Sequence, residues 1–308
     1  MVDLKYKELI NSTVDKLVNA DSLELVYHKP NYGHKMPSRK RMSEVVELIK
    51  SVIFPGYFGS SKVEPCTLQF HIGVAVDQIN TILKSQINRG LCFVCQEDDT
   101  HECIGCDNKA EKLATQFIEL LPKIREQLAK DVEATYYADP ASKSYGEIIF
   151  AYPGITAITN YRIAHELLKL GVPLLPRIIA EISHSETGID IHPRATIGEY
   201  FTIDHGTGIV VGATCIIGNH VTLYQGVTLG AKSFPLDDEG NPVKGVPRHP
   251  IVEDNVTIYS GATILGRITI GKGTMIGGNV WLTNSVPANS KIVQHKAKEV
   301  YFADGAGI

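Results

Sequence analysis

The chain has 308 residues, of which 44% are hydrophobic and 21% charged, and its formal net charge is −4. This composition is typical of a folded protein with enough apolar side chains for one large domain or two smaller ones. A weakly negative chain has no general electrostatic attraction to nucleic acids or anionic membranes, so neither is expected as a partner. The first residues form no apolar leader, and no apolar run is long enough to span a membrane. A cytoplasmic location with reduced cysteines is therefore expected.

Up to about Ser185 the chain has the apolar spacing of helices. Six apolar residues recur every three or four positions and form one stripe: Leu113, Phe117, Leu120, Leu121, Ile124 and Leu128. Such spacing indicates an amphipathic helix with one buried face. Pro122 lies within the stripe, so a kink or a break is expected there.

Three further helices are predicted from the apolar pattern, over residues 43–53, 72–89 and 153–170. The last begins at Pro153, which suits a first helical turn, and a glycine and a proline follow its end. Residues 31–41 are rich in glycine, proline and basic side chains, and are predicted to form a loop.

From Ile189 onward the spacing of aliphatic residues changes to six. Three successive registers show it: Ile191, Ile197 and Ile203; Val211, Ile217, Leu223 and Leu229; then Val252, Ile258, Ile264, Ile270, Ile276 and Leu282. Neither a helix nor an alternating strand has this period, whereas a three-sided coil with faces six residues long does. The sequence therefore predicts a parallel β-helix of hexapeptide repeats. A run of ordinary short strands joined by glycine turns is the simpler alternative.

The last two registers are separated by a long interruption. Between Leu229 and Val252 the coil must eject a loop over residues 232–247, whose centre is turn-forming Asp-Asp-Glu-Gly-Asn-Pro. Loops that leave a rigid scaffold are common places for binding residues, so a site is expected near this loop.

Four short segments occur in the order in which serine acetyltransferases have them. They are Asp139-Pro140-Ala141, Gly-Ile-Asp-Ile-His-Pro over 188–193, Ile-Asp-His-Gly-Thr-Gly-Ile-Val-Val-Gly over 203–212, and Arg248-His249-Pro250. From about Ala134 to Asn289 the chain resembles this family in order and content, whereas earlier residues match only in helical character. The resemblance implies an α+β protein, in which an all-helical N-terminal domain precedes a left-handed parallel β-helix with an ejected loop.

The expected domains are a helical one over 1–187, a β-helix acyltransferase domain over 188–290 and a flexible tail over 291–308. The resemblance implies transfer of an acetyl group from acetyl-CoA to the hydroxyl of L-serine, giving O-acetyl-L-serine for cysteine biosynthesis. It also implies inhibition by L-cysteine, and assembly into a homotrimer or a dimer of trimers with sites between subunits.

The serine hydroxyl is a poor nucleophile near neutral pH and needs a base to take its proton. By resemblance, His205 is that base, and Asp190 orients its imidazole ring as the second member of a catalytic dyad. A histidine in a folded core is often only a buried, hydrogen-bonded side chain, and this alternative applies to His205. His192, which precedes Pro193, is expected to be structural.

The amino-acid substrate also needs partners for its carboxylate and its ammonium group. Arg248 suits the carboxylate, because a guanidinium binds it through two parallel hydrogen bonds. By resemblance, Asp204 and Asp139 with its neighbour Pro140 form the ammonium side, and His249 contacts the hydroxyl. The simpler readings are a surface cation for Arg248 and a turn-capping role for Asp139.

An extended pantetheine arm needs a groove of small residues along the coil. The candidates for acetyl-CoA binding are Ala231, Ser260, Gly261, Gly277, Gly278 and, for the 3′-phosphate, Lys272. In the family a glycine amide faces the thioester oxygen at the position of Ala231, which retains that amide. Lys232 and Lys244 are alternatives to Lys272.

Four of the six cysteines form two Cys-x2-Cys pairs: Cys92, Cys95, Cys103 and Cys106. Two such pairs suit a tetrahedral structural zinc, although the pairs are closer together than is usual. A reversible disulfide or unmetallated thiols are the alternatives. Cys66 and Cys215 are predicted to be buried as small apolar groups.

The chain ends in an aliphatic residue, Ile308, with a terminal carboxylate. In serine acetyltransferases a C-terminal isoleucine inserts into O-acetylserine sulfhydrylase, so the resemblance implies this enzyme as a partner. A terminal carboxylate can be captured by backbone amides of a partner. An ordinary frayed terminus is the alternative.

Three other functions are compatible with a hexapeptide coil. Acyl transfer to a sugar or an antibiotic would not need the charged set assigned to an amino acid. A metal-dependent hydratase of the gamma carbonic anhydrase type needs three histidines at one metal, and the candidates are His192, His205 and His220. Their neighbours do not resemble that motif, and a non-catalytic binding module would have no use for the dyad.

Overall fold

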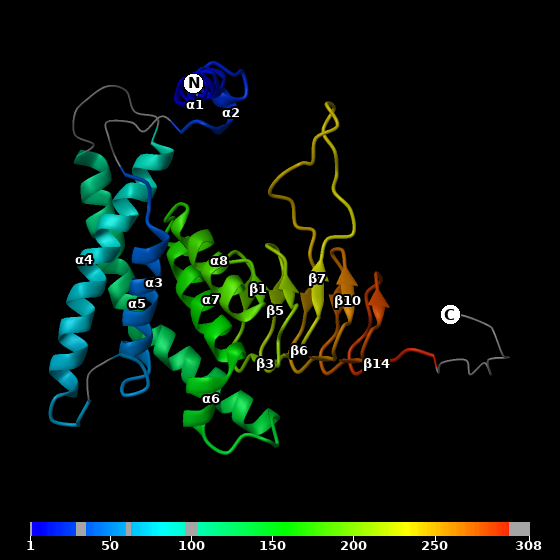
Figure 1. Ribbon diagram of the computed structural model, residues 1–308. Coiled ribbons are helices and arrows are strands. Elements are labelled where there is room, and N and C mark those ends of the chain that lie inside the picture. Colours follow the sequence, from blue (N-terminus) through cyan, green and yellow to red (C-terminus); the bar gives the residue numbers. More distant parts are fainter. Residues whose placement is uncertain (1, 29–34, 60–62, 96–103, 296–308) are drawn as a thin grey trace.

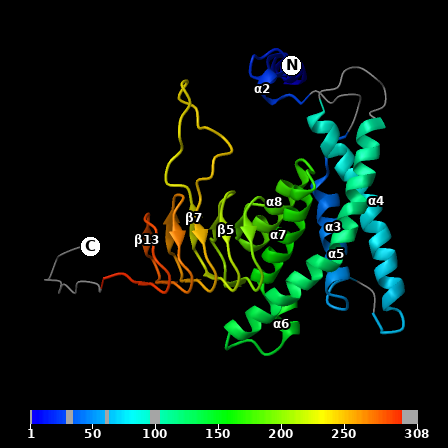
Figure 2. The same cartoon turned by 180° about the vertical axis from the view of Figure 1, so that it is seen from behind.

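The computed structural model describes residues 2–28, 35–59, 63–95 and 104–295. A set of helices is followed by a coil of short strands that extends away from them (Figures 1 and 2). The helices are α1 (Val2–Val18), α2 (Leu23–Val26), α3 (Arg39–Ile53), α4 (Leu68–Val94), α5 (Ile104–Ala138), α6 (Tyr145–Ala151), α7 (Pro153–Lys169) and α8 (Leu175–Thr187). Within the described parts of the chain, no helix has the length and apolar character needed to cross a membrane.

The predicted helices are confirmed as α3, α4, α5 and α7. Helices α3, α4 and α5 pack against one another, and α7 and α8 lie between them and the coil (Figure 1). The loop predicted over 31–41 is wrong at its end, because α3 already begins at Arg39. There the Ser38 hydroxyl accepts a hydrogen bond from the N–H of Arg41 and caps the helix. Residues 29–34 of that loop lie outside the described residues.

Helix α5 continues through Pro122, so the break expected there does not occur. Five residues of its apolar stripe are buried: Leu113, Phe117, Leu121, Ile124 and Leu128. A proline inside a helix costs about 3 kcal/mol or more. Each large apolar side chain buried in the core gives back about 1.5–3 kcal/mol, so the packed stripe outweighs that cost.

Four helices were not anticipated: α1, α2, α6 and α8. Helix α6 has a sequence signal, because the Ser144 hydroxyl accepts the N–H of Glu147 and the Glu147 carboxylate accepts the N–H of Lys143. Helix α8 ends at Gly188, whose φ of 69° is the left-handed conformation that glycine adopts without strain.

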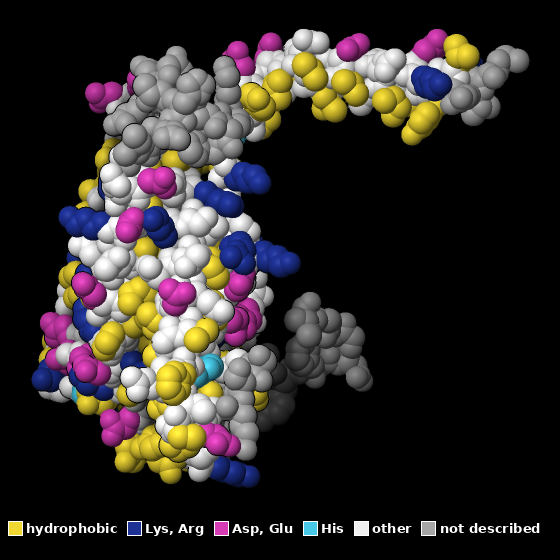
Figure 3. Space-filling view, turned by 90° about the vertical axis from the view of Figure 1, so that its left-hand side faces the viewer, with side chains coloured by type: hydrophobic (Ala, Val, Ile, Leu, Met, Phe, Trp, Pro, Cys, Tyr) yellow, Lys and Arg dark blue, Asp and Glu magenta, His cyan; other side chains and the backbone are white. Residues whose placement is uncertain are grey.

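Helix α1 has a broad apolar side that remains exposed, as Figure 3 shows along one side of this helix. Its large exposed apolar residues are Leu4, Tyr6, Leu9, Ile10, Val14, Leu17 and Val18. Such a side is unusual for a helix in water and is typical of a contact surface.

The coil has three faces, each a parallel sheet, and the chain visits them in turn. The first face consists of β1 (Asp190–Ile191), β4 (Val210–Val211), β7 (Thr228–Gly230), β10 (Thr263–Leu265) and β13 (Trp281–Leu282). The second consists of β2 (Thr196–Ile197), β5 (Ile216–Ile217), β8 (Ile251–Val252) and β11 (Thr269–Ile270). The third consists of β3 (Thr202–Asp204), β6 (Thr222–Tyr224), β9 (Thr257–Ile258), β12 (Met275–Ile276) and β14 (Lys291–Ile292). The predicted left-handed parallel β-helix is confirmed.

The six-residue registers predicted the inward positions correctly. On the first face Ile191 pairs with Val211, Val211 with Leu229, Leu229 with Ile264, and Ile264 with Leu282. All predicted inward residues are buried except Leu282, which is partly buried near the end of the coil. The predicted loop also leaves the coil between β7 and β8 and projects far from it (Figure 1).

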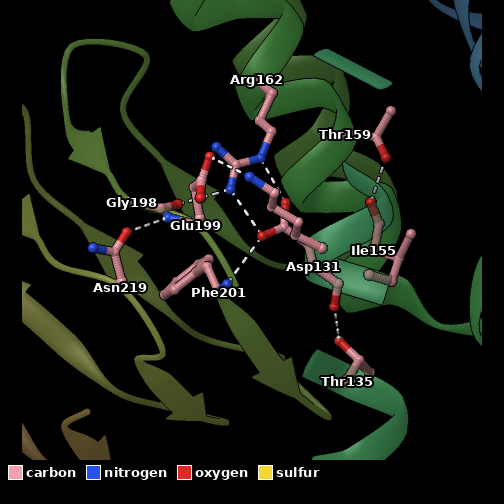
Figure 4. Close-up of polar contacts among 10 residues, drawn as sticks. Asp131, Thr135, Ile155, Thr159, Arg162, Gly198, Glu199, Phe201 and Asn219 are labelled. Carbon is pink, nitrogen blue, oxygen red and sulfur yellow. Dashed lines mark hydrogen bonds and ion pairs between the residues drawn. The ribbon is translucent and has the colours of Figure 1, made fainter. Parts of the chain in front are cut away.

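A buried ion pair joins the helices to the coil (Figure 4). Arg162 of α7 donates two hydrogen bonds, of 2.6 and 2.8 Å, to the two carboxylate oxygens of Asp131 of α5. Arg162 also donates to the carbonyl of Gly198, and the N–H of Phe201 donates to Asp131. Both charged groups are hydrogen-bonded within this junction. The C-terminal part of α5 is therefore held at a fixed position against β3.

Candidate active site

His205 lies on the corner between the third and first faces, directly after Asp204, which ends β3. Its φ is 58°, a conformation that few residues other than glycine adopt. Three-quarters of its side chain is exposed, and its Nε2 lies 3.8 Å from Asp204 Oδ1. His205 is therefore not a buried core histidine, and its ring is accessible to a substrate.

Asp190 opens the first face at the same corner, one coil turn before His205. It pairs with Val210, and its N–H donates to the carbonyl of Ile209. The structure thus brings Asp190 and His205 to one edge of the coil. No hydrogen bond joins the two side chains in the described chain, so the orienting contact expected of a dyad is not formed here.

Asp139 follows the last turn of α5 and reaches the same corner from the helical side. It lines a small cavity with Asp204; the other lining residues are Thr135, Ala138, Tyr152, Thr202, Ile203, Thr222 and Tyr224. The Tyr152 hydroxyl donates a 2.6 Å hydrogen bond to Asp139 Oδ2, and the N–H of Ala141 donates to Oδ1. These two donors, Tyr152 first, lower the pKa of Asp139, so it is charged when a cation approaches. Pro140 is exposed in the turn that follows.

Arg248 and His249 lie elsewhere, on the corner between the first and second faces where the projecting loop returns. Thr214 holds both: its hydroxyl accepts the N–H of Arg248 and that of His249, and its own N–H donates to His249 Nδ1. A Cβ built on Gly212 would lie 1.9 Å from the His249 ring, so the ring occupies the space of a missing side chain. His249 is consequently buried, and burial lowers its pKa.

The Arg248 guanidinium has a hydrogen-bonding capacity that the described chain does not use. Its Nε is buried and has no hydrogen-bond partner among the described residues. The central guanidinium carbon, Cζ, lies 5.4 Å from the ring centre of Phe234 in the projecting loop. An unsatisfied buried donor costs about 1–3 kcal/mol, so an acceptor at this position would stabilise the arrangement.

The candidate residues therefore form two half-sites. Asp139, Asp204 and His205 lie at one corner, whereas Arg248 and His249 lie at another, across the width of the first face. The cavity around Asp139 includes neither Arg248 nor His249. One chain by itself does not enclose all five residues.

The candidates for acetyl-CoA binding are divided among three corners. Four of them lie on the corner of His205, further along the coil: Ser260, Gly261, Gly277 and Gly278. Ala231 lies at the base of the projecting loop, and Lys272 lies between the second and third faces, away from both. The coil itself requires one of these glycines, because a Cβ at Gly261 would lie 2.3 Å from Asn279 Oδ1.

The three histidines of a possible hydratase do not converge in one chain. His192 lies between the first and second faces, and its Nδ1 accepts the N–H of Arg194. His205 lies on another corner, and His220 lies on the third, stacked on Tyr200 with ring centres 4.4 Å apart. Among the described residues no group of three or more His, Cys, Asp or Glu could hold a metal ion.

Three of the four cysteines proposed to bind zinc lie among the described residues. Cys92 and Cys95 lie at the end of α4 and Cys106 lies in the first turn of α5, but Cys103 is outside the described residues. Cys215 is buried as predicted. The prediction for Cys66 is wrong, because this residue lies exposed in the turn before α4. Ile308 also lies outside the described residues.

Sequence reasoning missed Tyr152, Thr214 and Tyr224. The Tyr152 hydroxyl donates a hydrogen bond to Asp139, which lies 13 positions earlier in the chain. Thr214 holds residues 34 and 35 positions later. The folded chain brings such residues together from separate segments, so no local sequence pattern could have found them.

The fold is that of a hexapeptide-repeat transferase. Residues 249–284 match the family model described as "Bacterial transferase hexapeptide (six repeats)". A curated relative, the plasmid-encoded serine acetyltransferase of Synechococcus elongatus, is 48% identical over 302 residues, which is 97% of this chain and 95% of the relative. The serine acetyltransferase of Bacillus subtilis is 45% identical over 166 residues, 54% of this chain and 72% of its own length.

Among solved structures, serine acetyltransferase 1 of Entamoeba histolytica in complex with L-cysteine matches with a TM-score of 0.71 and 32% identity. The match covers 91% of this chain and 94% of that structure. This chain belongs to the serine acetyltransferase family.

Proposed function

We propose that this protein transfers the acetyl group of acetyl-CoA to the hydroxyl of L-serine and releases O-acetyl-L-serine and CoA. The observation that supports the substrate best is the arrangement of charge. Two carboxylates and an accessible imidazole share one corner, and a guanidinium with an unused donor lies on the next. This set matches an amino-acid zwitterion with a hydroxyl, and a neutral sugar would leave these charged groups without partners of opposite charge.

In the proposed reaction His205 is the general base. Its imidazole takes the hydroxyl proton of serine as the serine oxygen bonds to the acetyl carbonyl carbon. The carbon–sulfur bond of the thioester then breaks, and the imidazolium returns the proton to the departing CoA sulfur. Asp190 lies at the same edge and would orient the ring once bound substrate and a neighbouring subunit cover this exposed corner.

Substrate binding follows from the remaining charges. Asp139 and Asp204 would hold the ammonium group, and Arg248 would bind the carboxylate through two parallel hydrogen bonds. Since Arg248 lies on a different corner from His205, we infer that the guanidinium at each site belongs to a neighbouring copy of the chain. His249 would face the hydroxyl from the same neighbour. Assembly into a homotrimer, or a dimer of trimers, would therefore be required for activity.

L-Cysteine is proposed as an inhibitor at the same site. It has the ammonium and carboxylate groups of serine and differs only in a sulfur for an oxygen, so the same charges would bind it. The Entamoeba histolytica relative was solved with L-cysteine bound, which supports this proposal.

Acetyl-CoA is proposed to lie along the corner that holds Ser260, Gly261, Gly277 and Gly278, which leads directly to His205. Ala231, on another corner, would act from the neighbouring copy, as proposed for Arg248. Lys272 lies on the corner between the second and third faces, away from the proposed path of acetyl-CoA in the same chain. We therefore propose that Lys232 or Lys244, in the projecting loop, binds the 3′-phosphate of CoA instead.

The proposed protein partner is O-acetylserine sulfhydrylase, through the C-terminal Ile308. Removal of this residue should abolish co-purification with the sulfhydrylase and leave acetyl transfer unchanged. Unchanged binding would refute the proposed contact.

The proposed activity is tested by measuring thiol release from acetyl-CoA with and without L-serine, and by identifying the product by mass spectrometry. Release that depends on L-serine and is suppressed by L-cysteine is the expected result. Release that is unaffected by L-serine, but stimulated by a sugar, would point to a different acyl acceptor and overturn the proposal.

A further inference from the structure

Tyr152 connects the helical side of the site to the coil side. Its hydroxyl donates a 2.6 Å hydrogen bond to Asp139 Oδ2, and it lines the cavity that Asp139 shares with Asp204. The contact with Asp139 raises the pKa of Tyr152 to about 12, with burial as the second cause, so the tyrosine remains a donor over the physiological range.

The position of Tyr152 is fixed by the backbone. Tyr152 directly precedes α7. Its N–H donates to the carbonyl of Ile148, and its carbonyl accepts a hydrogen bond from the N–H of Thr156. Two residues later, a Cβ on Gly154 would lie 2.5 Å from the carbonyl oxygen of Ile203. Helix α7 thus begins in direct contact with β3, the strand that ends in Asp204. The backbone of Tyr152 is therefore held beside the coil, while its hydroxyl reaches Asp139 at the end of α5.

Asp139 needs such an anchor, because it lies in an exposed turn between α5 and α6. The N–H of Ala141 holds one of its carboxylate oxygens, but that contact is local to the turn and would move with it. Among the described residues, the hydrogen bond from Tyr152 is the one that reaches this carboxylate from outside its own turn.

We propose that Tyr152 is a positioning residue for amino-acid binding, whose hydroxyl fixes the Asp139 carboxylate in the cavity that it shares with Asp204. The inference rests on the proposed function, in which these two carboxylates hold the substrate ammonium. Tyr152 touches neither the reacting hydroxyl nor the thioester in this scheme. Its loss should therefore weaken binding of the amino acid and leave the chemical step intact.

The test is Tyr152→Phe in the full-length protein, with steady-state kinetics from thiol release. The KM for L-serine should rise about tenfold or more, because a hydrogen bond to a charged group is lost, while kcat and the KM for acetyl-CoA stay within about twofold. Inhibition by L-cysteine should weaken in the same proportion. Residual turnover of 3-hydroxypropionate, which lacks the ammonium group, should be equal in the two proteins.

Two further variants separate positioning from general damage. Tyr145→Phe removes a hydroxyl from a neighbouring helix outside the cavity and should leave the KM for L-serine unchanged. In an Asp139→Asn background, Tyr152→Phe should give no additional loss of kcat/KM. A wild-type KM for Tyr152→Phe, or a loss of equal size in both backgrounds, would overturn the inference while the proposed function stands. Absence of L-serine-dependent release by the wild-type protein would instead sink the proposed function and this inference together.

Discussion

At the scale of single residues, most charged groups of the site are held by neighbours that carry no charge. Tyr152 holds Asp139, and Thr214 holds Arg248 and His249 through its hydroxyl and its backbone. His205 is the exception, since its backbone has a left-handed conformation and its ring lies 3.8 Å from the charged Asp204. The charged residues themselves could be named from the sequence because they fall in short motifs. Their supports could not, because they come from distant positions.

His192 and His249 give the protein a predictable response to acid. Burial first, and then Arg177 and Arg194, lower the pKa of His192 to about 4, and burial lowers the pKa of His249. An unfolded histidine takes up its proton near pH 6.5. Between about 6.5 and 4 the unfolded state therefore binds more protons than the folded state, and stability falls as the pH falls through this range.

The thermal unfolding midpoint should accordingly decrease from pH 6.5 towards pH 4. The decrease should be smaller in His192→Gln, which has no group to protonate at this position. Differential scanning calorimetry at several pH values checks this, and an identical decrease in the two proteins would show that His192 is not responsible.

At the scale of elements, the coil was predictable to the residue and the helices only in part. A six-residue register has to place an aliphatic side chain at each inward position, so Ile191 to Ile276 could be assigned from spacing alone. Helix α6 has a capping signal in its sequence, whereas helix α8 and the continuity of α5 through Pro122 depend on packing against other elements. Such tertiary effects override local preference, and the sequence pattern does not contain them.

The ion pair between α5 and α7 should be essential for the junction of helices and coil. Arg162→Ala leaves the fully buried Asp131 without its partner, which should lower the free energy of unfolding by about 3–5 kcal/mol. The matched control is Lys130→Ala, which removes the neighbouring exposed pair with Glu199 and should lower the stability far less, because solvent screens this pair. Urea denaturation compares the two, and equal, small effects would show that the buried pair does not stabilise the junction.

At the scale of the whole molecule, the two half-sites lie on separate corners, and we propose that active sites form between copies. Neither His205→Ala nor Arg248→Ala should be active alone. Mixed and reassembled, the two variants should recover about a quarter of the wild-type activity, because that share of random interfaces combines an intact His205 with an intact Arg248. Activity in the mixture no higher than in the separate variants would show that each site is formed within one chain.

The role of His205 is the claim on which the reaction depends, and turnover of His205→Ala with L-serine and acetyl-CoA tests it most directly. His220→Ala is the matched control, because it removes a coil histidine from another corner. The account predicts a kcat lower by ~10²–10⁴-fold for His205→Ala, with an unchanged circular dichroism spectrum and near wild-type turnover for the control. Full turnover by His205→Ala would contradict it.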